Sequence, residues 1–269
     1  ATGDATWGPE IRQSFTGIER VVGSAGDDTL TGGLADHTLI GGDGSDTADY
    51  GHRTDSVILH LAGGTVSVAE VGVDQLVAVE RGVTGSGDDV LIAAETGSTL
   101  IGNEGVDALL GGPGADVLRG GADGDQLFGN PQQESESNSI DTVDYSDQPG
   151  GVSVDLDGGV AWALSTPGVQ DSIAEVERAV GSAFDDVFKG ALGGYTFVGG
   201  GGTDIADYST AWLGLDMDLV AGQVSYVEGG SDALVGIDVL RGGNANDNLT
   251  GGLSGHTLDG GGGTDRADY

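Results

Sequence analysis

Aspartates that recur at one position of a nine-residue pattern are the residues of this chain best suited to chemistry. Three consecutive units, GNEGVDALL, GGPGADVLR and GGADGDQLF, fill residues 102–128 and follow G-(G/N)-x-G-x-D-x-L-x, with Asp123 replacing the position-four glycine of the third unit. A glycine-rich loop allows backbone carbonyls to converge, and each aspartate adds an anionic oxygen. Because calcium accepts mixed shells of carbonyl and carboxylate oxygens, the pattern predicts sites for a hard cation.

Each unit must also fold into an element that positions its aspartate. The glycines and small residues allow a tight turn, and the last three residues place one leucine on the inner side of a short strand. One unit cannot bury its leucine alone, so successive units must stack and cover each other's apolar side. We therefore predict an all-β fold, a parallel β-roll or β-solenoid with extra β-rungs between the repeats.

Three further groups of nonapeptides have Asp at the sixth position of their outer units and another residue in the middle unit. The groups are GSAGDDTLT, GGLADHTLI and GGDGSDTAD; GSAFDDVFK, GALGGYTFV and GGGGTDIAD; and GGNANDNLT, GGLSGHTLD and GGGGTDRAD. The middle units carry His37, Tyr195 and His256. If two nonapeptides form one turn of a flattened roll, aspartates two units apart face each other across one ion. The middle unit then lies on the opposite edge, where no aspartate is needed.

A longer repeat encloses the nonapeptides and closes on the motif x-x-D-Y. The motif ends at Tyr50, Tyr145, Tyr208 and Tyr269, which divides one continuous solenoid into cycles 1–50, 51–145, 146–208 and 209–269. Each complete cycle opens with alternating residues that predict a strand, a small-residue turn and a second strand. The segments 15–22, 76–83 and 173–180 are predicted to be extended, with one or two helical turns as the alternative. Residues 131–139 form a polar loop insertion.

The composition is strongly acidic. The chain of 269 residues has 44 acidic and 9 basic residues, a formal net charge of −35, and 33 of the acids are Asp. Like charge of this size opposes a compact state, so we expect bound counter-ions; general halophilic acidity is the alternative. Nucleic acid and anionic membrane surfaces are poor partners for a chain of this charge, so neither is expected. Cysteine is absent and no apolar run is long enough for membrane insertion.

The two ends of the chain lead to one further expectation. The chain begins at Ala1 without the basic start and apolar core of a signal peptide, and it stops at Tyr269 within the repeat pattern. We expect it to be a segment of a longer protein.

The nonapeptides are similar to the calcium-binding repeats of RTX (repeats-in-toxin) proteins. The interleaved ADY, V-x-V-D-L and I-E-x-V-x-G-S segments resemble the C-terminal repeat region of serralysin-type secreted proteases. The resemblance implies a parallel β-roll in which Ca²⁺ is bound by the carbonyls of positions two and four and the Asp of one unit. The carbonyls of positions one and three and the Asp of the unit one turn later complete each site. It also implies a bacterial protein that is secreted or at the cell surface, exported by type I secretion.

Applied to this chain, the resemblance implies five pairs of loops with the regular spacing and a sixth pair that contains the insertion. The five are Ser24, Gly26 and Asp28 with Gly41, Asp43 and Asp46; Gly85, Gly87 and Asp89 with Gly102, Glu104 and Asp107; Asn103, Gly105 and Asp107 with Gly120, Ala122 and Asp125; Ser182, Phe184 and Asp186 with Gly199, Gly201 and Asp204; and Gly243, Ala245 and Asp247 with Gly260, Gly262 and Asp265. The sixth, Gly112, Gly114 and Asp116 with Asp141, has the insertion between its loops.

Two positions of the predicted calcium-binding loops depart from the repeat. Phe184 and Ala245 replace glycine, and we expect the backbone angle there to cost about 1 kcal/mol and to weaken two sites.

With about six ions bound, the net charge would move from −35 to roughly −23. We therefore expect calcium to drive a disorder-to-order transition.

Other chemistry finds little support in the sequence. The chain has no HExxH, G-x-S-x-G, phosphate-loop or CxxC pattern, so no enzymatic activity is expected from it. The adjacent acids Asp27-Asp28 and Asp185-Asp186 are better explained by the repeat than as a glycosidase pair. Sugar binding by Trp7, Trp162 and Trp212 is an alternative to their covering the ends of rungs.

Three classes of function are compatible with such a module. We expect an extender, scaffold or adhesin segment of a secreted or surface bacterial protein, with calcium ions as its partners. The alternatives are the C-terminal folding and secretion module of a protease, lipase or polysaccharide-modifying enzyme, and a surface-layer or self-assembling lattice protein. Self-association and a cell-surface or polysaccharide partner are left open.

Overall fold

The computed structural model describes residues 2–6, 12–33, 36–68, 72–130, 139–165, 168–190, 193–226, 229–252 and 255–269. These residues form strands and turns, and they contain no helix long and apolar enough to cross a membrane. The chain divides into two compact units, residues 1–141 and 142–269. Residues 131–138 of the expected insertion and Trp7 lie outside the described residues.

The first unit contains two sheets. The strands are β1 (Thr2–Thr6), β2 (Arg12–Thr16), β3 (Arg20–Val22), β4 (Thr29–Thr31), β5 (Thr38–Ile40), β6 (Thr47–Asp49), β7 (Ile58–His60), β8 (Thr65–Val68), β9 (Gly72–Val77), β10 (Arg81–Val83), β11 (Val90–Ile92), β12 (Thr99–Asn103), β13 (Ala108–Leu110), β14 (Val117–Gly121) and β15 (Gln126–Phe128). One sheet has the order β2-β1-β4-β6-β10-β12-β14, and the other has the order β15-β13-β11-β7-β8-β9-β5-β3.

The second unit repeats this architecture. Its strands are β16 (Thr142–Asp144), β17 (Val152–Asp155), β18 (Val160–Ala163), β19 (Asp171–Ala174), β20 (Arg178–Val180), β21 (Val187–Lys189), β22 (Thr196–Val198), β23 (Ile205–Asp207), β24 (Leu215–Asp218), β25 (Gln223–Tyr226), β26 (Ser231–Val235), β27 (Val239–Arg241), β28 (Asn248–Thr250), β29 (Thr257–Asp259) and β30 (Arg266–Asp268). The orders are β16-β20-β22-β26-β25-β24-β28-β30 and β29-β27-β23-β21-β17-β18-β19.

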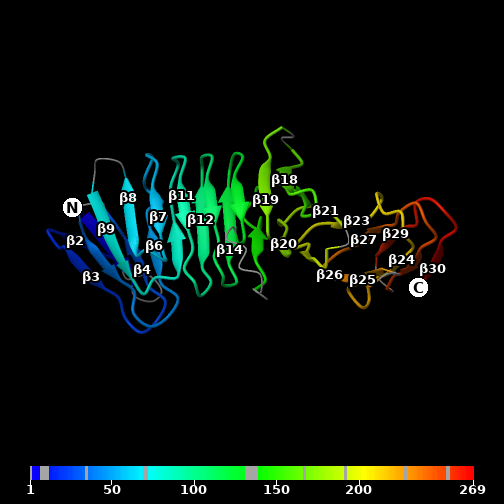
Figure 1. Cartoon of the computed structure of the whole chain (residues 1–269), viewed down its shortest axis with the longest axis horizontal. Helices are drawn as coiled ribbons and strands as arrows, with labels where there is room; N and C mark the ends of the chain where they lie inside the picture. The colour runs from blue at the N-terminus through cyan, green and yellow to red at the C-terminus, as the bar shows by residue number, and fades with distance from the viewer. Residues whose placement is uncertain are drawn as a thin grey trace. The chain divides into compact units, whose positions relative to one another are not determined.

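Within each unit the nonapeptide strands pair in parallel with strands two units away. Thr29 pairs with Thr47, and Val90 pairs with Ala108, so one turn of the roll contains two nonapeptides. In Figure 1 the strands of the first unit, drawn from blue to green, lie beside one another as successive rungs. The parallel β-roll predicted from the repeat is confirmed.

The core of each unit is the column of middle residues of these short strands. A typical nonapeptide strand buries its central residue and leaves the two flanking residues half-buried. Leu30, Leu39, Leu109 and Phe188 are all fully buried in this way. Full burial of such a side chain contributes about 1.5–3 kcal/mol, so stacking many coils stabilises what one unit cannot.

Antiparallel hairpins interrupt the roll and supply the predicted extra rungs. The three-stranded hairpins are β7-β8-β9, β17-β18-β19 and β24-β25-β26. Segments 76–83 and 173–180 are extended, as predicted, except for short turns at 78–80 and 175–177. The last strand of a hairpin returns to the roll beside a much earlier strand, because Thr38 of β5 pairs with Gln75 of β9.

The middle nonapeptide is held by an aspartate from the hairpin. His37 N–H donates to Asp74 Oδ1 at 2.9 Å, and the buried Tyr50 hydroxyl donates to Asp74 Oδ2 at 2.8 Å. Asp232 accepts in the same way from Tyr195 N–H and the Tyr208 hydroxyl, each at 2.8 Å. The tyrosine that ends the x-x-D-Y motif therefore fixes a carboxylate where the middle unit lacks its own.

Candidate metal centres

Aspartates two nonapeptides apart are stacked directly on one another. In each pair the backbone N–H of the earlier aspartate donates to Oδ1 of the later one. The bonds are Asp28 to Asp46 at 2.8 Å, Asp89 to Asp107 at 2.8 Å, Asp107 to Asp125 at 2.9 Å, Asp186 to Asp204 at 2.9 Å and Asp247 to Asp265 at 3.0 Å. The structure thus brings together the aspartates of all five pairs that the sequence analysis singled out.

The second carboxylate oxygen of the earlier aspartate converges with a carbonyl of the next coil. A Cβ added at Gly23, the first residue of its loop, would overlap both Asp28 Oδ2 and the Gly41 carbonyl oxygen. The same overlap, with the aspartate of the same loop and the first carbonyl of the next coil, would occur at Gly102, Gly181 and Gly242. Glycine at position one therefore leaves the space in which two oxygens of a predicted site approach each other.

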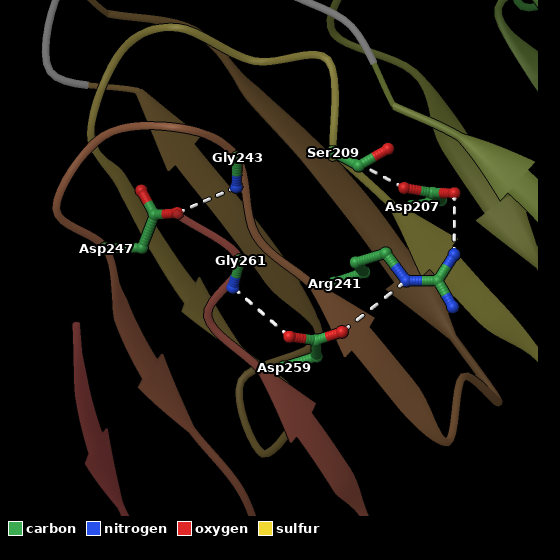
Figure 2. Close-up of polar contacts among 7 residues, drawn as sticks. All are labelled: Asp207, Ser209, Arg241, Gly243, Asp247, Asp259 and Gly261. Carbon is green, nitrogen blue, oxygen red and sulfur yellow. Dashed lines mark hydrogen bonds and ion pairs between the residues drawn. The ribbon is translucent and has the colours of Figure 1, made fainter. Parts of the chain in front are cut away.

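Some of these carboxylate oxygens are satisfied within their own loop. Ser182 N–H donates to Asp186 Oδ2 at 2.7 Å. Gly243 N–H donates to Asp247 Oδ2 at 2.8 Å, as Figure 2 shows beside the ion pairs of Arg241 with Asp207 and Asp259.

In the described part of the chain, Oδ2 of Asp46 and of Asp107 is buried without a hydrogen-bond partner. In these two loops position two has a positive φ, 129° at Gly42 and 77° at Asn103. A buried oxygen that lacks a donor is costly, and a cation would satisfy it.

Carbonyls at position two face the following coil. Glu104 N–H donates to the Gly85 carbonyl at 3.1 Å, and Gly262 N–H donates to the Gly243 carbonyl at 2.8 Å. The Ser182 carbonyl accepts from Gly201 N–H at 3.2 Å. The resemblance implies these carbonyls as ligands. They lie beside the aspartates, at the boundary between two stacked loops.

Burial makes the charged form of these aspartates unfavourable in the metal-free fold. Burial, together with the charges of Asp89, Asp88 and Asp123, raises the pKa of Asp107 to about 7. Burial and the charges of neighbouring carboxylates raise the pKa of Asp204 to about 6. Burial likewise raises the pKa of Asp46, Asp89, Asp116 and Asp186. A divalent cation between the loops would offset this cost.

The donor set fits calcium better than a metal that prefers side chains alone. Among the described residues no group of three or more His, Cys, Asp or Glu side chains is placed to hold a metal. Each pair of loops instead offers two carboxylates and several backbone carbonyls. This oxygen-rich set suits a hard cation that accepts irregular geometry.

Residues 14–48, 101–132 and 232–267 match the family model of the RTX calcium-binding nonapeptide repeat, which comprises four copies. These segments are RTX calcium-binding repeats. No curated protein matches the chain. The chain therefore contains a structural calcium-binding module folded as a β-roll, and such repeats are typical of extracellular bacterial proteins.

The RTX pair interrupted by the insertion is also brought together. Asp116 N–H donates to Asp141 Oδ1 at 2.8 Å although the two residues are 25 positions apart. A Cβ at Gly111 would overlap Asp116 Oδ2 and the carbonyl of Gly129. The inserted residues therefore leave the stacking of the two aspartates intact, and Asp116 and Asp141 are proposed as ligands with the others.

The strain expected at Phe184 and Ala245 is absent, so that expectation was wrong. Neither residue has a positive φ. Both stand at position four of the earlier loop of a pair. Gly26, at the same position, also has no positive φ, and the space that a Cβ would take there is open. The positive φ occurs at position four of the later loop instead, as at Gly44 with 129°.

The adjacent acids of the RTX loops have separate roles. Asp27 Oδ1 accepts from Ser45 N–H at 2.8 Å, and Asp185 Oδ1 accepts from Thr203 N–H at 2.7 Å. The position-five acid thus caps a backbone N–H of the next coil, and the position-six acid lies inside the stack. This placement accounts for the acid pairs without any catalytic role.

Two acids that the repeat pattern does not predict enter the columns of stacked aspartates, which we call the aspartate ladders. Glu80 Oε2 accepts from Asp46 N–H at 2.9 Å, and Asp238 Oδ2 accepts from Asp204 N–H at 3.0 Å. Both follow a buried apolar residue in the turn after a hairpin. The recurrent pair V-E or I-D before the next strand was the available signal.

Among the tryptophans, Trp162 and Trp212 are described. Lys189 Nζ lies 5.0 Å from the centroid of the Trp162 ring, in a cation–π contact. Trp212 is 73 % exposed. Sugar binding by these residues stays a prediction.

Proposed function

We propose that this chain is a calcium-dependent structural segment, an extender or adhesin part of a larger secreted or surface bacterial protein. Its proposed ions lie between successive coils, where they hold the stack together instead of facing a substrate. The observation that carries the proposal is the convergence, at successive pairs of loops, of a buried carboxylate oxygen with a carbonyl of the next coil.

The series of proposed calcium sites also favours a chain that folds when it reaches a calcium-rich medium. A chain with a formal net charge of −35 that buries several carboxylates is opposed by self-repulsion and by desolvation in the absence of cations. Calcium binding supplies folding free energy, since the complete sites exist only when the coils are stacked. Export as an unfolded chain followed by folding outside the cell is consistent with this coupling.

Removal of calcium is expected to abolish most of the strand signal at neutral pH. Far-ultraviolet circular dichroism of the chain in calcium, after chelation, and after calcium is restored measures this change. Magnesium at the same concentration is the control, because its preference for regular octahedral geometry fits these loops poorly. A strand spectrum that is unchanged by chelation would contradict the proposal.

Acid is expected to replace calcium in part. The folded pKa values of Asp107 and Asp204, about 7 and about 6, lie above the ordinary 3.8. Between pH 3.8 and the raised pKa of each group, the metal-free fold therefore binds more protons than the unfolded chain. The stability of the metal-free fold rises as the pH falls through this window. The gain is at most about 1.4 kcal/mol per pH unit and group.

The acid effect is measured on calcium-depleted protein, with circular dichroism recorded from neutral pH down to about pH 5, within that window. More strand signal at the lower pH is the expected result. A signal that stays constant or decreases on acidification would show that the buried aspartates do not limit the metal-free fold.

A further inference from the structure

Two short turns that are not nonapeptides occupy the place of a loop in the aspartate ladders. They are residues 78–80 and 236–238, each of which links the last strand of a hairpin to the next strand of the roll. Each begins with a left-handed residue, Ala78 with φ of 50° or Gly236 with φ of 65°. A buried Val79 or Ile237 follows, and the turn ends in an acid.

These turns reproduce the oxygen arrangement of the RTX pairs. A Cβ added at Gly41 would overlap Asp46 Oδ2 and the Ala78 carbonyl oxygen. A Cβ added at Gly199 would overlap Asp204 Oδ2 and the carbonyl oxygen of Gly236. The first carbonyl of a nonapeptide occupies this position elsewhere, so the turn supplies an equivalent oxygen to the loop that precedes it in the stack.

The acids of the turns complete the resemblance. Glu80 accepts the Asp46 N–H, and Asp238 accepts the Asp204 N–H, in the manner of the aspartates of the regular pairs. Both acids are half-buried. Each turn therefore adds a carboxylate to the stack directly after a nonapeptide aspartate, Asp46 in the first unit and Asp204 in the second.

An independent observation supports a cation site at the first of these places. Asp46 is 0 % exposed, and its Oδ2, which converges with the Ala78 carbonyl, has no hydrogen-bond partner in the described part of the chain. An N–H donor satisfies the corresponding oxygen of Asp186. A charged, buried carboxylate oxygen that faces a carbonyl without an intervening donor is unfavourable, and a cation between the two oxygens would offset this cost.

We propose that each turn forms a further calcium site with the loop before it, an inference that rests on the calcium-binding function proposed above. In the first unit the ligands are Asp46, Glu80 and the Ala78 carbonyl, with the carbonyls of Gly42 and Gly44. In the second unit Asp204, Asp238 and the Gly236 carbonyl correspond.

The turns are shorter than a nonapeptide loop, and this length limits the number of ligands that each site has for calcium. In each turn the carbonyl of the first residue lies beside the aspartate oxygen, where a nonapeptide loop would offer the carbonyls of positions one and three. Residues 42–45 are exposed to solvent, so water completes the shell. We therefore expect these two sites to bind calcium more weakly than the nonapeptide pairs, and they extend calcium binding to points where a hairpin interrupts the roll.

Substitution of the turn acids tests the proposal on the whole chain. Equilibrium dialysis with radioactive calcium, up to about 10 mM free ion to include weak extracellular-type sites, counts the bound ions. Glu80→Gln keeps the shape and an oxygen acceptor for Asp46 N–H but removes the charge. We expect E80Q to lose one bound calcium per chain, D238N to lose one, and the double variant to lose two.

Glu19 provides a matched control. It follows a left-handed Gly17 and precedes β3, as Glu80 follows Ala78 and precedes β10. However, β3 is the last strand of its sheet in the described part of the first unit, so no coil precedes Glu19 in the ladder. Glu19→Gln should leave the calcium count unchanged while altering the net charge equally.

The outcomes separate this inference from the function on which it rests. Failure of the unsubstituted chain to bind calcium would overturn both. An unsubstituted chain that binds calcium, with E80Q and D238N binding as many ions, would overturn the further sites alone. An equal loss in E19Q would also overturn them, because the effect would then come from net charge and not from ligation.

Discussion

Asp107→Asn is expected to destabilise the calcium-loaded chain by about 5 kcal/mol. Asp107 belongs to two stacked pairs, with Asp89 on one side and Asp125 on the other. Asparagine keeps an oxygen that accepts the Asp89 N–H, but it removes the anionic oxygen that converges with the Gly120 carbonyl. One site at a hundred times its Kd contributes about 2.7 kcal/mol by mass action, so weakening two sites doubles that loss.

The measurement for Asp107→Asn is denaturant unfolding at a fixed calcium concentration, together with the calcium concentration at which half of the chains fold. The matched control is Asp88→Asn in the stacked loop that carries Asp89. Asp88 is exposed and caps Val106 N–H at 3.0 Å, a bond that asparagine retains. It should change the stability by less than about 0.5 kcal/mol. Equal effects of the two substitutions would refute ligation by Asp107 and indicate a general charge effect.

Gly44→Ala is expected to cost about 4 kcal/mol and to weaken the site between Asp28 and Asp46. Gly44 has a φ of 129°, a conformation that residues with a side chain rarely adopt. A Cβ there would lie 2.9 Å from the backbone carbon of Gly26 in the preceding coil. Backbone strain of about 1–3 kcal/mol adds to a similar cost for separating two packed coils.

Gly26→Ala is the control for Gly44→Ala, because both glycines occupy position four of loops in the same pair. Gly26 has no positive φ, and a Cβ there meets nothing within 4 Å. We expect a change of less than about 1 kcal/mol, as the natural alanine at position 245 of the corresponding loop suggests. Thermal unfolding in calcium compares the two variants. Similar losses in both would mean that the close approach of the coils does not determine which glycine is required.

Much of the roll was predictable because its determinants are local in the sequence. A leucine or other apolar residue at position eight must point inward if the preceding glycines form a turn, as Leu30 and Leu109 do. The two-unit register of Thr29 with Thr47 follows once two nonapeptides make a turn. The aspartate pairs were predictable for the same reason, since a constant spacing places Asp28 and Asp46 on one edge.

The distinction between the earlier and later loop of a pair was not predictable in this way. Position four is glycine in both loops of the first pair, yet only Gly44 has a positive φ. The difference arises because the later loop must fit over the carbonyl groups of the earlier one, while Gly26 faces open space. The prediction of strain at Phe184 and Ala245 was wrong because the nonapeptide pattern is the same in both loops and does not distinguish the earlier loop from the later one.

The repeat pattern predicts the roll, but the contacts that the hairpins make are defined only by the tertiary structure. The periodic positions of glycine, aspartate and leucine were enough to specify an all-β roll and its proposed calcium ligands, because each residue acts on the neighbouring coil at a constant separation. Asp74, Glu80 and Asp238 interrupt that constancy, since each acts on a loop 34 or 37 residues earlier. Their roles are defined only when the hairpin folds back and returns the chain to the same ladder.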